Sequence, residues 1–327
     1  MVRKHSRFGM RAGGDPTVPM TVVALALGAL VLLSPGLLQA QAKVGTTGAQ
    51  FLELGVSARA MGMAEAYTAV SDDITSIYYN PAGLTYLYGR ELGLTYIGMP
   101  ADINYGLVAF GLPLESVGGV VGFGFYGLHS SYMDVTDYFG IPTGQEFAWQ
   151  DFALSVSYGR YLTDRFSIGL TVKYIREEAF EYSANGWSAD VGTIYNTGFR
   201  GFKIAMIINN FGPDMTFTER EFPLPINFKF GGSINAIDGV DHVLTLAAEG
   251  SHPSDNLEKY NSGLEYTFRD RFSLRAGGRF NYDVDGFTAG GGLRLPFGED
   301  QEIRLDYAFQ DWGVLTEVHR FSMIIAF

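Results

Sequence analysis

From Glu91 to the C-terminus, the sequence is a succession of segments in which apolar and polar residues alternate, separated by short groups of turn residues. Alternation with a period of two is typical of half-buried β-strands, because successive side chains point to opposite faces of a sheet. Fourteen such segments are present, and a closed up-and-down barrel with both ends on one side of a membrane requires an even number of strands. The predicted strands are 91–99, 104–112, 118–128, 146–161, 166–177, 186–196, 202–209, 227–236, 242–251, 259–268, 272–282, 286–295, 301–309 and 316–327.

The lengths of the connections favour a membrane barrel over a soluble sandwich. Turns after even-numbered strands are short, as at 162–165 and 269–271, whereas connections 129–145 and 210–226 after odd-numbered strands are long. Outer-membrane barrels sort their loops in this way, with the short turns facing the periplasm. We therefore expect an all-β, 14-stranded antiparallel transmembrane barrel that faces the lipid bilayer of a bacterial outer membrane. Aromatic residues flank the short turns, as an interfacial girdle does: Tyr161, Phe166, Phe268 and Phe272.

The first 42 residues have the three parts of a secretory signal peptide. Four basic residues precede the apolar run 22–33, and small residues end at Ala40-Gln41-Ala42. Cleavage is expected after Ala42, which leaves 43–90 as a separate segment and 91–327 as the barrel. The alternative is an uncleaved helical anchor, but the run is short for a span and is interrupted by Ser34-Pro35-Gly36.

The composition supports the interpretation of the segments as strands and argues against nucleic acid as a binding partner. Each of the 42 glycines would destabilise a helix by up to about 1 kcal/mol relative to Ala. An aromatic content of 14% with only 18% charged residues excludes a disordered chain, and the absence of Cys excludes a disulfide scaffold. Without the first 42 residues, 19 Lys and Arg stand against 34 Asp and Glu, a net charge of about −15. Nucleic acid is therefore not an expected partner.

The last predicted strand ends on an aromatic residue and resembles the assembly signal of bacterial outer-membrane proteins, so the barrel-assembly machinery is an expected partner. The alternative is an ordinary edge strand. A long unpaired apolar edge promotes aggregation, and closure onto the first strand would remove that edge. The apolar stripe consists of Phe321, Met323, Ile325 and Phe327.

Residues 43–90 break the strand pattern and are rich in Ala and Gly. A segment of about 48 residues cannot form a core of its own, so we expect a partly helical plug that packs against or inside the barrel. Pro81 fixes its own φ and biases Asn80 away from helix, while Gly83 permits a tight or left-handed turn. This predicts a rigid turn, either with or without a contact to a solute. Asp72 and Asp73 are interpreted as capping or turn residues, with a gating role as the alternative.

One block of motifs in this segment resembles the N-terminal region of the PorV/PorQ family, which is related to the FadL-type (OmpP1/FadL/TodX) outer-membrane transporters. The block runs Ser57-Ala58-Arg59, Met61-Gly62, Ala66-Tyr67, Ala69-Val70, Asp72-Asp73 and Asn80-Pro81-Ala82-Gly83-Leu84. In FadL-type proteins the matching region forms a plug or hatch inside a 14-stranded barrel. The plug-motif residues to which the resemblance points are Arg59, Gly62, Asp72, Asp73, Asn80, Pro81, Ala82 and Gly83.

The resemblance implies two different functions. The PorV type serves as an outer-membrane shuttle of type IX secretion, with secreted cargo proteins or secretion-system subunits as partners. FadL-type proteins carry fatty acids and other hydrophobic small molecules. Such a conduit should have an apolar pocket near its outer loops and a gap in the barrel wall, whereas the lumen faces of these strands are polar and rich in Gly. This chain is shorter than FadL and has modest outer loops. The loop 210–226, with Phe211, Met215, Phe217 and Phe222, is either a protein-binding surface or a loop that lies on lipid. The motif block favours the secretion function.

Charged residues on the inferred lumen face come from four consecutive strands near the C-terminus. Unpaired charges in a narrow lumen are costly, so we expect ion pairs among them or with plug acids such as Glu53, Asp72 or Asp73. Our hypothesis is that this lumen charge cluster holds the plug, and the alternative is a solvated polar wall. Its members are Glu265, Arg275, Arg279, Arg294, Arg304 and Asp306.

Motifs for catalysis or cofactor binding are absent from the sequence. Gly122–Gly127 matches G-x-G-x-x-G, but it lies inside a predicted strand with no helix after it, so nucleotide binding is not expected. The sequence has no G-x-S-x-G, P-loop or H-E-x-x-H motif, and its histidines have no ligand-like spacing. We therefore expect no enzymatic activity, no cofactor and no metal.

Overall fold

The computed structural model describes residues 44–283, 286–298 and 301–327. The predicted signal peptide, residues 1–42, lies outside the described residues.

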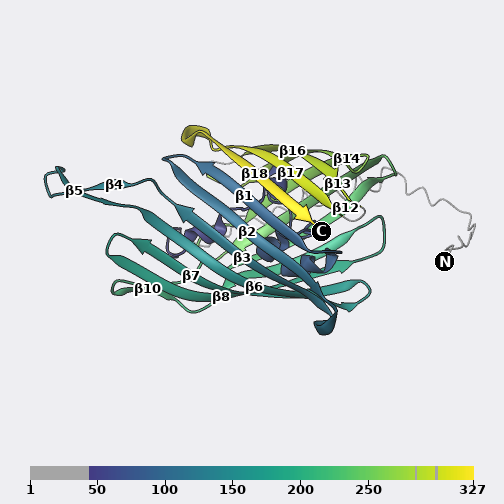
Figure 1. Ribbon diagram of the computed structural model, residues 1–327, viewed down its shortest axis with the longest axis horizontal. Coiled ribbons are helices and arrows are strands. Elements are labelled where there is room, and N and C mark those ends of the chain that lie inside the picture. The colour runs from purple at the N-terminus through teal and green to yellow at the C-terminus, as the bar shows by residue number, and fades with distance from the viewer. Residues whose placement is uncertain (1–43, 284–285, 299–300) are drawn as a thin grey trace, which may run out of the picture. The chain divides into compact units, whose positions relative to one another are not determined.

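Fourteen antiparallel strands form a closed barrel (Figure 1). Each strand pairs with the next barrel strand along the chain, and β1 pairs with β18 to close the sheet, as predicted. The N–H of Phe327 donates to the Arg90 carbonyl and the N–H of Arg90 to the Phe327 carbonyl, which extends the closure. The strands are β1 (Glu91–Met99), β2 (Ile103–Leu114), β3 (Gly119–His129), β6 (Trp149–Thr163), β7 (Phe166–Ala179), β8 (Tyr182–Asn196), β9 (Lys203–Phe211), β12 (Asn227–Asp238), β13 (His242–Pro253), β14 (Lys259–Phe268), β15 (Phe272–Phe280), β16 (Phe287–Pro296), β17 (Glu302–Asp311) and β18 (Glu317–Ala326).

The two long connections, predicted as loops, each contain a small hairpin. β4 (Met133–Thr136) pairs with β5 (Pro142–Phe147), and this hairpin projects away from the barrel (Figure 1). β10 (Met215–Phe217) pairs with β11 (Arg220–Phe222). Strands of three to six residues are too short to show a clear alternation in the sequence. Both hairpins lie at the end of the barrel opposite the short turns, which is the external end of an outer-membrane barrel.

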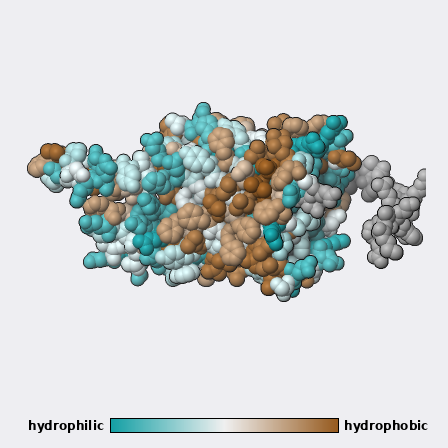
Figure 2. All heavy atoms as spheres, viewed as in Figure 1, coloured by the Kyte–Doolittle hydropathy of each residue, from teal (hydrophilic) through white to brown (hydrophobic). Residues whose placement is uncertain are grey.

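The barrel buries polar side chains and exposes apolar ones, the reverse of a soluble sheet. On β7, Thr171 and Lys173 are at most 1% exposed, whereas Val172 between them is 43% exposed. This confirms the predicted alternation of lipid-facing and lumen-facing residues. Apolar side chains gather in a belt across the strands, with polar residues toward both ends (Figure 2). None of the helices in the described ranges is both long enough and apolar enough to cross a membrane.

Residues 44–90 cross the lumen as short helices and turns, and we refer to them as the plug. α2 packs against β15–β18, while η2 packs against β3 and β6–β8 on another part of the wall. Ser57 begins α2 by accepting a hydrogen bond from the N–H of Ala60. The plug helices are η1 (Gln50–Glu53), α2 (Ala58–Gly62), α3 (Ser76–Tyr79) and η2 (Pro81–Tyr86); η3 (Glu115–Val117) and η4 (Gly313–Leu315) lie in barrel connections.

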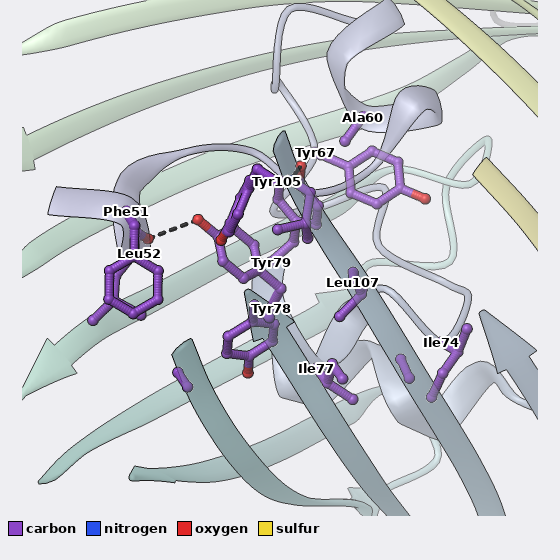
Figure 3. Close-up of a cluster of buried hydrophobic side chains, with 14 of the residues drawn as sticks. Phe51, Leu52, Ala60, Tyr67, Ile74, Ile77, Tyr78, Tyr79, Tyr105 and Leu107 are labelled. Atoms are coloured by element: carbon purple, nitrogen blue, oxygen red, sulfur yellow. Dashed lines mark hydrogen bonds between the residues drawn. The ribbon is translucent and has the colours of Figure 1, made fainter. Parts of the chain in front are cut away.

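A cluster of aromatic and aliphatic side chains joins the plug to the wall (Figure 3). Tyr78 and Tyr79 of α3 meet edge to face, with ring centroids 5.1 Å apart. The Tyr78 hydroxyl donates to the Leu52 carbonyl at 2.6 Å, and Tyr105 of β2 belongs to the same buried cluster. The plug therefore shares one hydrophobic core with the inner face of the barrel.

Candidate functional site

A row of three wall glycines receives the start of the Asn80–Gly83 turn. Gly159, Gly169 and Gly192 are direct register partners on the adjacent strands β6, β7 and β8. A Cβ at Gly159 would lie 2.6 Å from the Pro81 carbonyl oxygen, and one at Gly169 or Gly192 would overlap Pro81 or Asn80. Glycine at these three positions therefore allows the plug backbone to approach the wall.

Asn80 fixes this turn to both the plug and the wall. Its side-chain oxygen accepts from the N–H of Ala82 and so caps η2, with Pro81 at the first helical position. Its amide nitrogen donates to the carbonyls of Thr68 at 3.0 Å and Thr193 at 3.2 Å. Gly83 is helical and not left-handed; it is required because a Cβ there would overlap the Ser71 carbonyl.

Arg59, on α2, forms the centre of an ion-pair network between plug and wall. Its guanidinium contacts Asp72 at 2.6 Å and Asp73 at 3.1 Å within the plug. It also donates two hydrogen bonds to Glu265 of β14, at 2.9 and 3.0 Å. A planar guanidinium with five donors suits this bidentate contact.

Asp73 acts both as a turn residue and as a member of the network. Its carboxylate accepts from the N–H and hydroxyl of Thr75 and from the hydroxyl of Tyr67. Burial alone would raise the pKa of Asp73, but the charge of Arg59 and the hydrogen bonds from Thr75 and Tyr67 lower it below its ordinary value. Asp73 therefore remains a carboxylate although it is buried.

The wall side of the network lies on β14, β15 and β17. Arg275 contacts Glu265 and Asp306, each at 2.6 Å. Gly62 at the end of α2 packs against this site, because a Cβ there would lie 3.1 Å from that of Arg275 and 3.3 Å from the Cα of Gly290. Glu265, Arg275 and Asp306 of the predicted lumen charge cluster thus form a chain of ion pairs that reaches Arg59 through Glu265.

The other three members of the predicted cluster lie apart from this centre. Arg279 contacts plug residue Glu65 at 3.3 Å. Arg304 contacts Glu91 of β1 at 3.0 Å, and Glu91 in turn accepts from the N–H of Ile74 in the plug. Arg294 reaches no plug acid and contacts the exposed turn residue Asp270 at 2.6 Å. The expected partner Glu53 makes no ion pair with any of these arginines among the described residues.

The inner cavity, of about 270 Å³, lies on the periplasmic side of the plug and is strongly polar. Arg59 and Asp72 line it from the plug, and Lys203 lines it from β9. Five of the six residues of the lumen charge cluster line it from the wall; Arg279 does not. Within the described ranges, no group of three or more His, Asp or Glu side chains is placed to hold a metal ion.

The outer cavity, of about 720 Å³, opens at the end that carries the hairpins, and no residue lines both cavities. Met61 of α2 faces it, whereas Arg59 lines the inner cavity. Its charged lining residues include Asp151, Glu177 and Arg279. Its apolar lining consists of Ala49, Phe51, Leu54, Met61, Ile103, Leu128, Trp149, Phe217, Phe222 and Trp312.

The outer cavity was not predicted as a set of residues, because its lining comes from the plug and from most of the outer connections. Sequence did single out the aromatic loop 210–226. Phe217 and Phe222 line the cavity and Met215 is buried, while Phe211 is 65% exposed. Phe217 and Phe222 of this loop therefore lie at the cavity, whereas Phe211 points outward.

The comparisons with known proteins support the fold. No protein-family model and no curated protein sequence matches the chain. Solved structures do: the Ralstonia pickettii toluene transporter TbuX has a TM-score of 0.59 at 14% identity, covering 83% of this chain and 97% of that one. The CymD monoaromatic hydrocarbon channel has a TM-score of 0.56 at 13% identity (84% and 98% covered). The Pseudomonas putida toluene transporter TodX has a TM-score of 0.53 at 12% identity (78% and 94% covered).

These likenesses are in the fold. They support the resemblance to FadL-type barrels, whereas the PorV/PorQ resemblance has no support among them. A closed antiparallel barrel with an apolar exterior satisfies its backbone hydrogen bonds within lipid. The chain is a bacterial outer-membrane β-barrel with a plugged lumen.

Proposed function

We propose that this barrel is a conduit for hydrophobic small molecules, which bind first in the outer cavity. The observation that carries this proposal is the apolar lining of a cavity of about 720 Å³ above the plug. Cavities of roughly 300–1,000 Å³ with apolar walls are typical of small-molecule sites. Three neighbours in fold are named as a toluene transporter, a hydrocarbon channel and a second toluene transporter, which agrees with this proposal.

The chain offers a clean optical test of binding. Of its three tryptophans, Trp149 and Trp312 line the outer cavity and Trp187 is 59% exposed on the barrel exterior. In a Trp187→Phe background, the remaining fluorescence reports on the cavity. Addition of 2-phenylethanol to the purified barrel should change the fluorescence saturably.

The matched control uses the same charge at two places on the outer end. Leu54→Asp places a carboxylate in the cavity lining and should abolish the saturable change. Val314→Asp places it on η4, where Val314 is 92% exposed and outside the lining, and should leave the change intact. A linear response in all three proteins would overturn the proposal.

Protein secretion remains a second candidate because of the β4–β5 hairpin. The hairpin projects from the end of the barrel (Figure 1), beyond the apolar belt (Figure 2). Between its two strands, Tyr138 is 97% exposed and Phe139 82% exposed. Asp137 holds the tip by accepting from the N–H groups of Phe139 and Ile141. An exposed apolar surface on an ordered turn suits a protein partner, such as a secretion subunit or cargo.

The double substitution Tyr138→Ser with Phe139→Ser tests this candidate. It should reduce secretion of cargo while binding of 2-phenylethanol persists. Unchanged secretion would rule the candidate out.

A further inference from the structure

Two carboxylates face each other in the outer cavity without a cation. Asp151 of β6 and Glu177 of β7 are direct cross-strand partners, and both line the cavity. Like charges directly opposite on neighbouring strands repel each other and destabilise a sheet. Neither forms an ion pair with any Lys, Arg or His among the described residues. The repulsion between the two carboxylates is therefore not offset by a cationic side chain.

The hydrogen bonds of the pair leave one buried oxygen without a partner. One oxygen of Asp151 accepts from the indole N–H of Trp149 at 2.7 Å, and the other accepts from no group in the described chain. Asp151 is only 6% exposed. Glu177 accepts from the N–H of Ala49 at 3.0 Å. A buried carboxylate oxygen without a donor is costly, so a donor from a ligand would stabilise it.

The cations of the cavity come from other strands and have partners of their own. Arg279 contacts Glu65, and Lys259 lies 5.1 Å from the Tyr282 ring centroid. Arg320 donates to Gln310 and to the Gly55 carbonyl. Asp151 and Glu177 thus form a separate acidic end of the cavity, which we call the pole.

We propose that the outer cavity accepts amphipathic ammonium compounds, with the cationic head between Asp151 and Glu177 and the apolar part among the aromatic residues. This inference rests on the proposed conduit function and names a substrate class for the same cavity. A metal ion suits the pole less well, because Ca²⁺ or Mg²⁺ requires about six to eight oxygen ligands and the pole offers two carboxylates beside apolar walls. An ammonium group carries both the charge and the donors that the pole lacks. The stacked rings of Trp149 and Phe217, with centroids 6.5 Å apart, lie beside it.

The test compares three ligands that differ only at the head group: 2-phenylethylammonium, 2-phenylethanol and 3-phenylpropanoate. Their affinities for the purified barrel are measured by calorimetry in non-ionic detergent and phosphate buffer. The ammonium compound should bind at least ten-fold more tightly than the alcohol, and the carboxylate most weakly. Asp151→Asn with Glu177→Gln should remove the advantage of the ammonium compound and change the affinity for the alcohol less than three-fold.

Glu178→Gln is the matched control, because Glu178 neighbours Glu177 but pairs with Arg176 at an exposed site. It should preserve the advantage of the ammonium compound. Equal affinities for ammonium and alcohol in the unaltered barrel, or an advantage that survives the double substitution, would overturn the ammonium site and leave the conduit standing. Failure of all three ligands to bind would overturn both proposals.

Discussion

Arg59 of the plug and Glu265 of the wall form a bidentate ion pair, with the guanidinium Nε and a terminal nitrogen 2.9 and 3.0 Å from the two carboxylate oxygens. The same guanidinium holds Asp72 and Asp73, so one plug side chain connects two plug acids to the barrel. Both residues line the polar inner cavity, and Met61 on the same helix lines the outer cavity. The Arg59–Glu265 pair is therefore the contact whose loss should release α2 from the wall.

Substitution of Arg59 should loosen the plug. Arg59→Ala leaves the buried Asp73 without its ion-pair partner and Glu265 with Arg275 alone. Removing one partner of a buried pair costs about 3–5 kcal/mol. We expect a lower free energy of unfolding, higher single-channel conductance and faster proteolysis of residues 44–90. Arg59→Lys should recover only part of the effect, because an ammonium lacks the bidentate geometry.

Arg294→Ala is the comparison for Arg59→Ala. In the Arg294–Asp270 pair the Asp270 side chain is 74% exposed and that of Arg294 35% exposed. Pairs open to solvent contribute roughly 0–1 kcal/mol. Conductance and proteolysis should stay near those of the unaltered barrel. Equal effects of Arg59→Ala and Arg294→Ala would contradict a special role for the Arg59–Glu265 pair.

The glycine row on β6–β8 should tolerate no side chain. Gly169→Ala would place a methyl group on the Pro81 backbone, and overpacking of this kind costs about 1–3 kcal/mol. We expect a folded barrel whose plug is more readily cleaved by protease. Gly250→Ala is the control, because its methyl group would meet only the Tyr260 ring, at 3.7 Å. Protection of the plug that is identical in the two variants would refute the docking role of the row.

Acid should weaken the contact between plug and wall through Asp73. Its pKa in the folded protein is lower than the ordinary value of 3.8, so its contribution to stability is present above that value. The contribution is lost as the pH falls from 3.8 through the folded pKa. Asp73→Asn should therefore flatten the dependence of unfolding free energy on pH below about 4. If the unfolding free energies of the unaltered protein and of Asp73→Asn change in parallel with pH, Asp73 does not cause the acid sensitivity.

Relief of the repulsion between Asp151 and Glu177 should stabilise the empty barrel. Asp151→Asn removes one of two opposed charges, and the unfolding free energy in urea should rise by up to about 1 kcal/mol without ligand. Glu178→Gln should not raise it. A lower unfolding free energy for Asp151→Asn would show that the two carboxylates do not destabilise the empty barrel.

The barrel was predictable from sequence because each of its strands is long and alternates, as on β7, where Val172 faces lipid and Lys173 the lumen. The partners of the lumen charges were not. Arg59 and Glu265 are 206 positions apart, and their meeting depends on the register of the whole sheet and on where α2 crosses it. Arg294 and Arg304 looked equivalent in sequence and are register partners, yet neither contacts a plug acid.

The outer cavity shows a different limit. Trp149, Phe217 and Trp312 lie in separate connections or at strand ends, and no local pattern marks them as neighbours. Their assembly follows from closure of the barrel. That Asp151 and Glu177 lie directly opposite each other could not be predicted either, because the predicted bounds of the two strands did not fix their register.

The most direct test of the conduit function is the initial rate at which intact cells take up radiolabelled toluene. Cells that produce the unaltered barrel or a variant are compared at equal amounts of folded barrel, with cells that lack the barrel as the reference. Cells with the unaltered barrel and with Val314→Asp should take up toluene faster than cells without the barrel, and cells with Leu54→Asp should not. Uptake at the same rate with and without the barrel, or undiminished uptake with Leu54→Asp, would contradict the account.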